Sequence, residues 1–271
     1  MTALLKRQYE GFLRTPQIFK NTALPNARIF ETNEIIDINL SEKNFAKLEK
    51  HKFLGKRAEY FLLDYLESCN RYTNVLHSYQ IHSEEKTIGE LDFVCFDLLQ
   101  QKWIHIELVF KLYVFTGDNQ YDDFSHWIGP NLKDRLDYKI KKLKSHQIPL
   151  GQHKSILSKT KATEIESYIC YKAKLFLKNT SVRLKSSKIN QDCISGTYIN
   201  IEEFKLLKHQ KSLFYVPKKM DWICAATSNK HWYSFEKAEE NLKLGSKEKR
   251  AKLVWQKTEN GLISEYFVVW W

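Results

Sequence analysis

Hydrophobic residues recur along the chain with two different periods, and each period predicts one kind of element. Between residues 54 and 67, apolar side chains three and four positions apart form one stripe, which predicts an amphipathic helix with Glu59 at its edge. Three runs rich in β-branched and aromatic residues follow, at 75–82, 88–96 and 103–115, and polar turns separate them. This spacing predicts antiparallel strands.

A second helix is predicted directly after Gly129-Pro130-Asn131, because leucine and isoleucine recur at helical spacing from residue 132 to residue 143. A strand is predicted at 168–177. The order helix, three strands, helix, strand (αβββαβ) is typical of an α/β fold in which helices flank a mixed central sheet.

The flanking sequence is expected to add to this core. Residues 1–50 are predicted to form an N-terminal extension packed on the core, and residues 51–190 to form the α/β core itself. Residues 191–271 are predicted to be a C-terminal α+β extension of the same domain, with a strand at 213–216, a helix at 234–244 and a closing apolar run at 262–271.

Charged residues lie inside two of the predicted strands. Because side chains alternate between the faces of a strand, Glu90 and Asp92 share one face, and His105, Glu107 and Lys111 share one face of the next strand. A carboxylate removed from water needs a partner, a metal ion or a shifted pKa. We therefore expect Asp92, Glu107 and Lys111 to converge around a shared cation. If the segment were helical, Glu107 and Lys111 would instead form an ordinary ion pair four residues apart.

The formal net charge of +11 is unevenly distributed, because residues 131–188 hold 15 Lys and Arg against 4 Asp and Glu. Such a basic segment attracts polyanions, of which nucleic acid is the commonest large one in a cell. The side chains expected to contact phosphates lie on the predicted second helix: Lys133, Arg135, Lys139 and Lys141. A membrane surface, an acidic protein and simple solubilisation of the surface are the alternatives.

Other sequence features bear on location. The chain has no secretory signal pattern and no apolar run of the roughly 20 residues needed to span a bilayer. Its five cysteines are odd in number and widely spaced, which argues against a disulfide framework. We expect a cytoplasmic protein that does not enter a membrane, and the sequence leaves its oligomeric state open.

The candidate residues also resemble a known group of enzymes. A helix with Glu59, the sequence Gly-Glu-Leu-Asp at 89–92 and an acidic following strand resemble the PD-(D/E)XK nuclease superfamily. More narrowly, residues 105–113, 129–131 and 134–137 are similar to domain of unknown function 1853, a bacterial family usually grouped with that superfamily.

This resemblance implies a restriction-endonuclease-like core and Mg²⁺-dependent hydrolysis of phosphodiesters, with DNA favoured over RNA and Mn²⁺ as a substitute ion. By position, Asp92 and Glu107 would hold the metal ion, and Lys111 would orient the attacking water. Three residues would support them: Glu59, Glu90 and His105.

The chain departs from the superfamily pattern at one position. The lysine normally stands two residues after the acid, where this chain has Val109, and Lys111 is four residues on, about 13 Å from Glu107 along a strand. The alternatives are that Lys111 binds a neighbouring phosphate, or that the fold has lost cleavage and binds nucleic acid or an acidic protein. A third class is a protein-interaction domain that uses the aromatic C-terminus.

Overall fold

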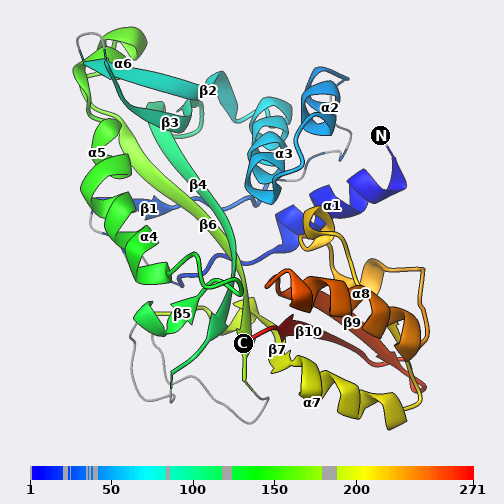
Figure 1. The fold of residues 1–271 in the computed structure, drawn as a ribbon. Coiled ribbons are helices and arrows are strands. Elements are labelled where there is room, and N and C mark those ends of the chain that lie inside the picture. Colours follow the sequence, from blue (N-terminus) through cyan, green and yellow to red (C-terminus); the bar gives the residue numbers. More distant parts are fainter. Residues whose placement is uncertain are drawn as a thin grey trace. The chain divides into compact units, whose positions relative to one another are not determined.

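The computed structural model describes residues 2–20, 24, 26–34, 36, 38, 42–83, 86–117, 124–178 and 188–271. The fold is mixed α/β, with a large mixed sheet flanked by helices (Figure 1). The chain divides into two compact units that are each assembled from separate stretches. The first unit consists mainly of Gln17–Phe110 and Tyr138–Lys172, and the second of Ala3–Pro16, Lys111–Asp137 and Ala173–Trp271. The division into consecutive ranges at residues 50 and 190 stays a prediction.

The first unit holds the predicted helix and the three predicted strands. Its helices are α2 (Glu42–Glu49), α3 (Leu54–Ser68), most of α4 (Leu136–Lys142), the π-helix η2 (Leu143–Gln147), α5 (Ile148–Leu150) and α6 (Lys154–Thr160). Its strands are β1 (Arg28–Ile29), β2 (Tyr72–Ser83), β3 (Lys86–Asp97) and the first parts of β4 (Lys102–Phe115) and β6 (Glu166–Leu177). Their order is β2-β3-β4-β6, and β1 pairs parallel with β6.

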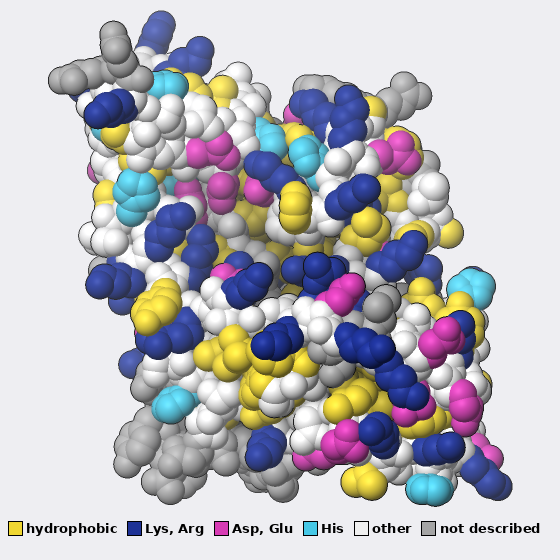
Figure 2. Space-filling view, in the orientation of Figure 1, with side chains coloured by type: hydrophobic (Ala, Val, Ile, Leu, Met, Phe, Trp, Pro, Cys, Tyr) yellow, Lys and Arg dark blue, Asp and Glu magenta, His cyan; other side chains and the backbone are white. Residues whose placement is uncertain are grey.

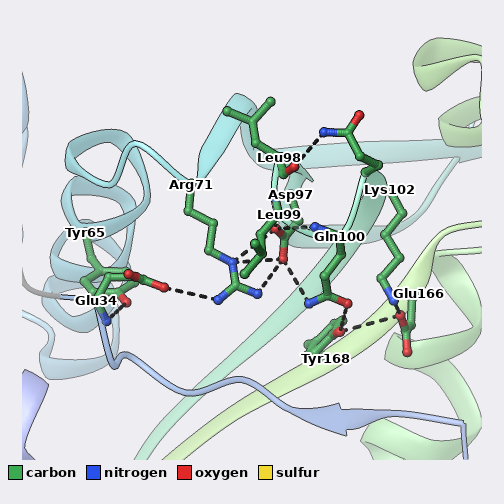
Figure 3. A network of polar contacts seen from close by, with 11 residues as sticks. Glu34, Tyr65, Arg71, Asp97, Leu98, Leu99, Gln100, Lys102, Glu166 and Tyr168 are labelled. Atoms are coloured by element: carbon green, nitrogen blue, oxygen red, sulfur yellow. Dashed lines mark hydrogen bonds and ion pairs between the residues drawn. The ribbon is translucent and has the colours of Figure 1, made fainter.

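Strand β3 lies between β2 and β4 and pairs antiparallel with both. The turn from β3 to β4 is fixed by Asp97, whose carboxylate accepts hydrogen bonds from the guanidinium of Arg71 and from the backbone N–H groups of Leu99 and Gln100 (Figure 3). Although burial opposes ionisation, these donors hold the pKa of Asp97 below its ordinary value. The closed turn fixes the register in which the two strands pair.

The second unit contains a sheet of its own strand order, β6-β7-β10-β9-β8, while β5 pairs with β4. Its helices and strands are α1 (Ala3–Arg14), η1 (Phe124–His126), β5 (Trp127–Ile128), η3 (Gln191–Cys193), β7 (Ile194–Asn200), α7 (Ile201–Leu206), η4 (Leu207–His209), β8 (Ser212–Tyr215), η5 (Lys219–Asp221), η6 (Ala226–Ser228), α8 (Phe235–Lys247), β9 (Lys252–Thr258) and β10 (Ile263–Val269). Phe204, Phe214 and Phe235 form the centre of its core, where α7 and α8 cover the sheet.

Most predicted elements are confirmed to within a few residues, including the helix at 54–67 and the strands of the first unit. The second predicted helix is wrong at its start. It begins at Leu136 because Leu132 has a left-handed φ of 60° and the N–H of Gly129 bonds to the carbonyl of Asp134 instead of continuing a helix. Lys133 and Arg135 therefore precede the helix.

Two further expectations concern the chain as a whole. No disulfide joins any of the five cysteines, all of which lie in the described ranges. Within those same ranges, no helix is both long enough and apolar enough to cross a membrane.

Candidate functional site

Asp92 and Glu107 lie opposite each other on β3 and β4, as the alternation of side chains predicts. The paired register of the two strands ends at Phe93 and Ile106, so Asp92 and Glu107 are the next residues along. Beyond that point the backbone N–H of Leu108 donates to Asp92 Oδ2 at 2.9 Å. A carboxylate thus takes the place of a backbone partner where the ladder ends.

Two features distinguish the surroundings of Asp92. First, Ser78 of the neighbouring strand β2 lies opposite Asp92, because His77 pairs with Phe93 and Tyr79 pairs with Leu91. Ser78 has a φ of 53°, a left-handed conformation that is uncommon for a residue with a side chain and that is often found beside functional sites.

The two carboxyl groups share a poorly solvated place. Glu107 is fully buried and Asp92 is half-buried. Burial, and next the negative charge of Glu107, raise the pKa of Asp92 from 3.8 to about 8. At neutral pH, Asp92 therefore tends to keep its proton unless a cation offsets the repulsion.

Hydrogen bonds hold Glu107 in one orientation. Its Oε1 lies 2.9 Å from Nε2 of buried His105, and its Oε2 accepts a hydrogen bond from the side-chain amide of Gln147. The other ring nitrogen of His105 lies 3.5 Å from the hydroxyl of Ser167. Glu107 is thus fixed from two sides, which is how carboxylates in catalytic and metal sites are commonly positioned.

A lysine approaches the two acids from the helical segment. The ammonium of Lys139 on α4 donates to Gln147 Oε1 at 2.8 Å, and its positive charge acts on Asp92 to lower the pKa of that carboxyl. The chain of contacts from Lys139 through Gln147 to Glu107 joins a cation to the buried acids.

Gln147 reaches Glu107 because the helical segment is not uniformly α-helical. Residues 136–150 form one continuous helical rod in which Leu143–Gln147 is a π-helix (Figure 1). A π-turn adds one residue per turn and rotates the side chains that follow it, and such turns are frequent at functional sites. Gln147 is the last residue of this turn.

The α3 side of the first unit contributes a second group of charges. Lys56 pairs with Glu59 at 2.5 Å and lies 3.9 Å from Glu90, and His77 lies 3.5 Å from Glu59. The charges of Glu59 and Asp92 act on each other, as do those of Lys56 and Asp92. Glu59, Glu90 and His105 are all brought to the neighbourhood of Asp92 or Glu107.

The remaining predicted residues are distributed over both units. Lys111 belongs to the second unit, where its ammonium pairs with Asp134 at 2.9 Å. Lys133 is exposed and Arg135 pairs with Asp137, both in the second unit, whereas Lys141 is exposed on α4.

The roles assigned to these residues stay predictions. Figure 2 shows Lys and Arg side chains spread over the visible face and interspersed with acidic and apolar ones.

The side chains around Asp92 and Glu107 suit a metal ion that completes its coordination with water and substrate. In the described part of the chain, no three His, Cys, Asp or Glu side chains are grouped closely enough to form a complete metal cage. Asp92 and Glu107 nevertheless provide two carboxylates. Mg²⁺ typically binds through one or two carboxylates, with water and substrate phosphate completing its octahedron, so this pair fits the ion.

Sequence reasoning missed one residue of this cluster, Gln147, and predicted another role for Lys139. Gln147 carries no signal, because the π-turn that directs it cannot be read from hydrophobic spacing. Lys139 was predicted to contact phosphates of nucleic acid, and in the structure it is half-buried and donates to Gln147.

Comparisons with known proteins give one match. No curated protein and no solved structure matches the chain. A protein family described as "Domain of unknown function (DUF1853)" matches residues 4–269, which is nearly the whole chain, and the protein belongs to that family.

Proposed function

We propose that this protein is a PD-(D/E)XK-like nuclease that hydrolyses phosphodiester bonds of nucleic acid with the help of Mg²⁺, acting on DNA in preference to RNA. The observation that supports the proposal is the meeting of Asp92 and Glu107 on adjacent strands. The order of helices and strands in the first unit fits a restriction-endonuclease-like core.

The energetics of the acid pair support a catalytic role. Burial, and next the nearby charge of Glu107, raise the pKa of Asp92, so ionisation of the pair costs free energy in the folded protein. Perturbed titratable groups of this kind concentrate at functional sites. A divalent cation would remove the repulsion, and nucleic acid supplies phosphate oxygens to complete its coordination.

Asp92 and Glu107 would hold the metal ion, which supplies Lewis-acid activation of the phosphate and of the water when it is bound. His105 and Gln147 keep Glu107 in place, and the N–H of Leu108 orients Asp92. In the reaction, water forms a new bond to phosphorus, the bond to the leaving oxygen breaks, and that oxygen takes up the proton that water loses.

Lys139 is the cation that the described contacts join to this pair. Its ammonium would stabilise the negative charge that develops on the phosphate oxygens in the transition state. The same duty was predicted for Lys111, which contacts Asp134. Mutating Lys139 tests which cation serves the site.

The test is a calorimetric titration of the purified protein with Mg²⁺ and with Mn²⁺, combined with cleavage assays on single-stranded DNA, duplex DNA and RNA. We expect the wild type to bind the ion and cleave at least one substrate. Asp92→Asn should lose both properties, because the amide oxygen carries no charge for the cation.

A matched control is Asp97→Asn, which changes another buried carboxylate of the same strand. It should keep metal binding at temperatures where it is folded. Absence of ion binding and of cleavage in the wild type would refute the nuclease proposal. Salt-dependent binding of DNA under those conditions would favour the second candidate, a nuclease-like fold that binds nucleic acid without cutting it.

A further inference from the structure

A cavity of about 680 Å³ opens in the first unit, at the N-terminal ends of β4 and β6. Its volume lies within the roughly 300–1,000 Å³ that is usual for small-molecule sites. Its walls come from β1, the starts of β4 and β6, and the helical segment from η2 to α5. The residues that matter for recognition are Arg28, Lys102, Trp103, Lys144, Glu166 and Ser167.

The cavity lining carries three cations, Arg28, Lys102 and Lys144, against two carboxylates, Glu164 and Glu166. Glu166 pairs with Arg28 through one oxygen, at 2.6 Å, and with Lys102 through the other. Figure 3 shows the contact of Lys102 with Glu166. The single negative charge of Glu166 is therefore shared between Arg28 and Lys102.

The pairing also leaves donors available. Arg28 uses Nε for Glu166, so its two terminal nitrogens make no hydrogen bond within the described ranges. Lys144 is exposed on the π-helix and has no ion-pair partner among the residues that the structure describes. Arginine and lysine in this state are the side chains that bind phosphate.

Other residues of the cavity lining are aromatic or apolar. Trp103 is half-buried, and its ring packs edge to face against Phe96 with the ring centroids 5.6 Å apart. Ile148, Pro149 and Ile165 line the cavity as well. An indole ring beside aliphatic side chains offers a stacking surface for a planar heterocycle.

We propose that this cavity binds one nucleotide, with its base against Trp103 and its phosphate among Arg28, Lys102 and Lys144. The combination of a stacking wall with cations distinguishes a nucleotide from inorganic phosphate, which needs no aromatic wall, and from an uncharged heterocycle, which needs no cations. Binding at this cavity is separate from the proposed hydrolysis and does not require it. The nucleotide is either free or the end of a nucleic-acid strand.

A short path joins the cavity to the acid pair. Ser167 on the cavity wall lies 3.5 Å from His105, which in turn contacts Glu107 at 2.9 Å. A nucleotide in the cavity would therefore lie next to the residue that orients Glu107.

The experiment measures binding by calorimetry at low salt with EDTA present, so that hydrolysis does not contribute. The probes are a nucleoside 5′-monophosphate, the corresponding nucleoside and inorganic phosphate. We expect saturable binding of one monophosphate per chain, and binding about tenfold or more weaker for the nucleoside and for phosphate.

Two pairs of variants link binding to the cavity. Trp103→Ala should weaken binding by about tenfold or more, while Trp103→Phe, which keeps a stacking ring, should retain most of it. Lys144→Ala should weaken binding by about threefold to tenfold, whereas Lys142→Ala, an exposed lysine of the same helical rod that does not line the cavity, should change it less than twofold.

Absence of saturable mononucleotide binding would overturn the proposal, as would equal effects of Lys144→Ala and Lys142→Ala. Competition with a single-stranded oligonucleotide identifies the source: displacement of the mononucleotide by the strand supports a strand end, and lack of displacement supports a free nucleotide. Asp92→Asn should bind the mononucleotide like the wild type, so failure of the nuclease proposal is distinguishable from failure of this one.

Discussion

Replacing Asp92 by asparagine is expected to make the metal-free protein more stable at neutral pH. The pKa of Asp92 is raised from 3.8 to about 8 by burial and by Glu107, so the folded protein holds a proton that the unfolded chain loses above about pH 4. The stability of the wild type should therefore fall as pH rises from about 4 to about 8. Asparagine has the same shape and no charge, and its amide oxygen can still accept from Leu108.

The magnitude follows from the size of the shift. In the unfolded chain the carboxyl of Asp92 has a pKa of 3.8, about three units below pH 7. Each unit corresponds to about 1.4 kcal/mol, so the gain in unfolding free energy has an upper bound of about 4 kcal/mol. Because Asp92 is only half-buried and shares its site with nearby cations, we take about half of this, or about 2 kcal/mol. For a chain of this length, the midpoint of thermal unfolding should rise by about 4 °C.

The assay is thermal unfolding of wild type and Asp92→Asn between pH 4 and pH 8.5 with EDTA present. The gap between the two midpoints should open as pH rises and close near pH 4. Asp97→Asn should behave in the opposite sense, because Arg71 lowers the pKa of Asp97 and the stabilisation from that ion pair is present above about pH 4 and lost in acid. If Asp92→Asn were less stable than wild type at every pH, ionised Asp92 would not destabilise the folded protein, and the reasoning would be refuted.

Three other changes test separate parts of the structure. Lys139→Ala should lower the single-turnover cleavage rate by about 100-fold, while Lys142→Ala, on the exposed side of the same helix, leaves it within about threefold. Gly151→Ala should destabilise the protein by about 1 to 3 kcal/mol in urea unfolding, because a Cβ at that position would lie 2.7 Å from Nδ1 of His105. Gly11→Ala should destabilise it by about 2 to 3 kcal/mol or more by the same measurement, since its Cβ would lie 2.1 Å from a backbone carbonyl that cannot rotate away.

The acid pair could be predicted from the sequence because it depends on local rules. Alternation along a strand assigns Asp92 and Glu107 to faces, and a short polar turn between the strands fixes an antiparallel register that puts them opposite each other. The strand β9 was not predicted. The β1 strand was missed as well, because a two-residue pairing with β6 is set by contacts distant in sequence.

The helical contribution to the site could not be predicted for a different reason. Hydrophobic spacing assumes 3.6 residues per turn. The π-turn at Leu143–Gln147 departs from that spacing at the point where Gln147 contacts Glu107. The left-handed Leu132 likewise delayed the helix by one turn. The late start of the helix reflects a local turn, in which the N–H of Gly129 bonds to the carbonyl of Asp134.

Two aspartates of β3, Asp92 and Asp97, differ in their surroundings, and we assign the first to function and the second to the fold. Asp97 receives a guanidinium and backbone N–H groups, so its ionisation stabilises the β3–β4 turn. Asp92 receives one backbone N–H and faces another acid, so its ionisation opposes folding. A charged residue that makes the protein less stable than an uncharged replacement would is expected where function requires the charge. For that reason we expect Asp92→Asn to be at once the more stable protein and the inactive one.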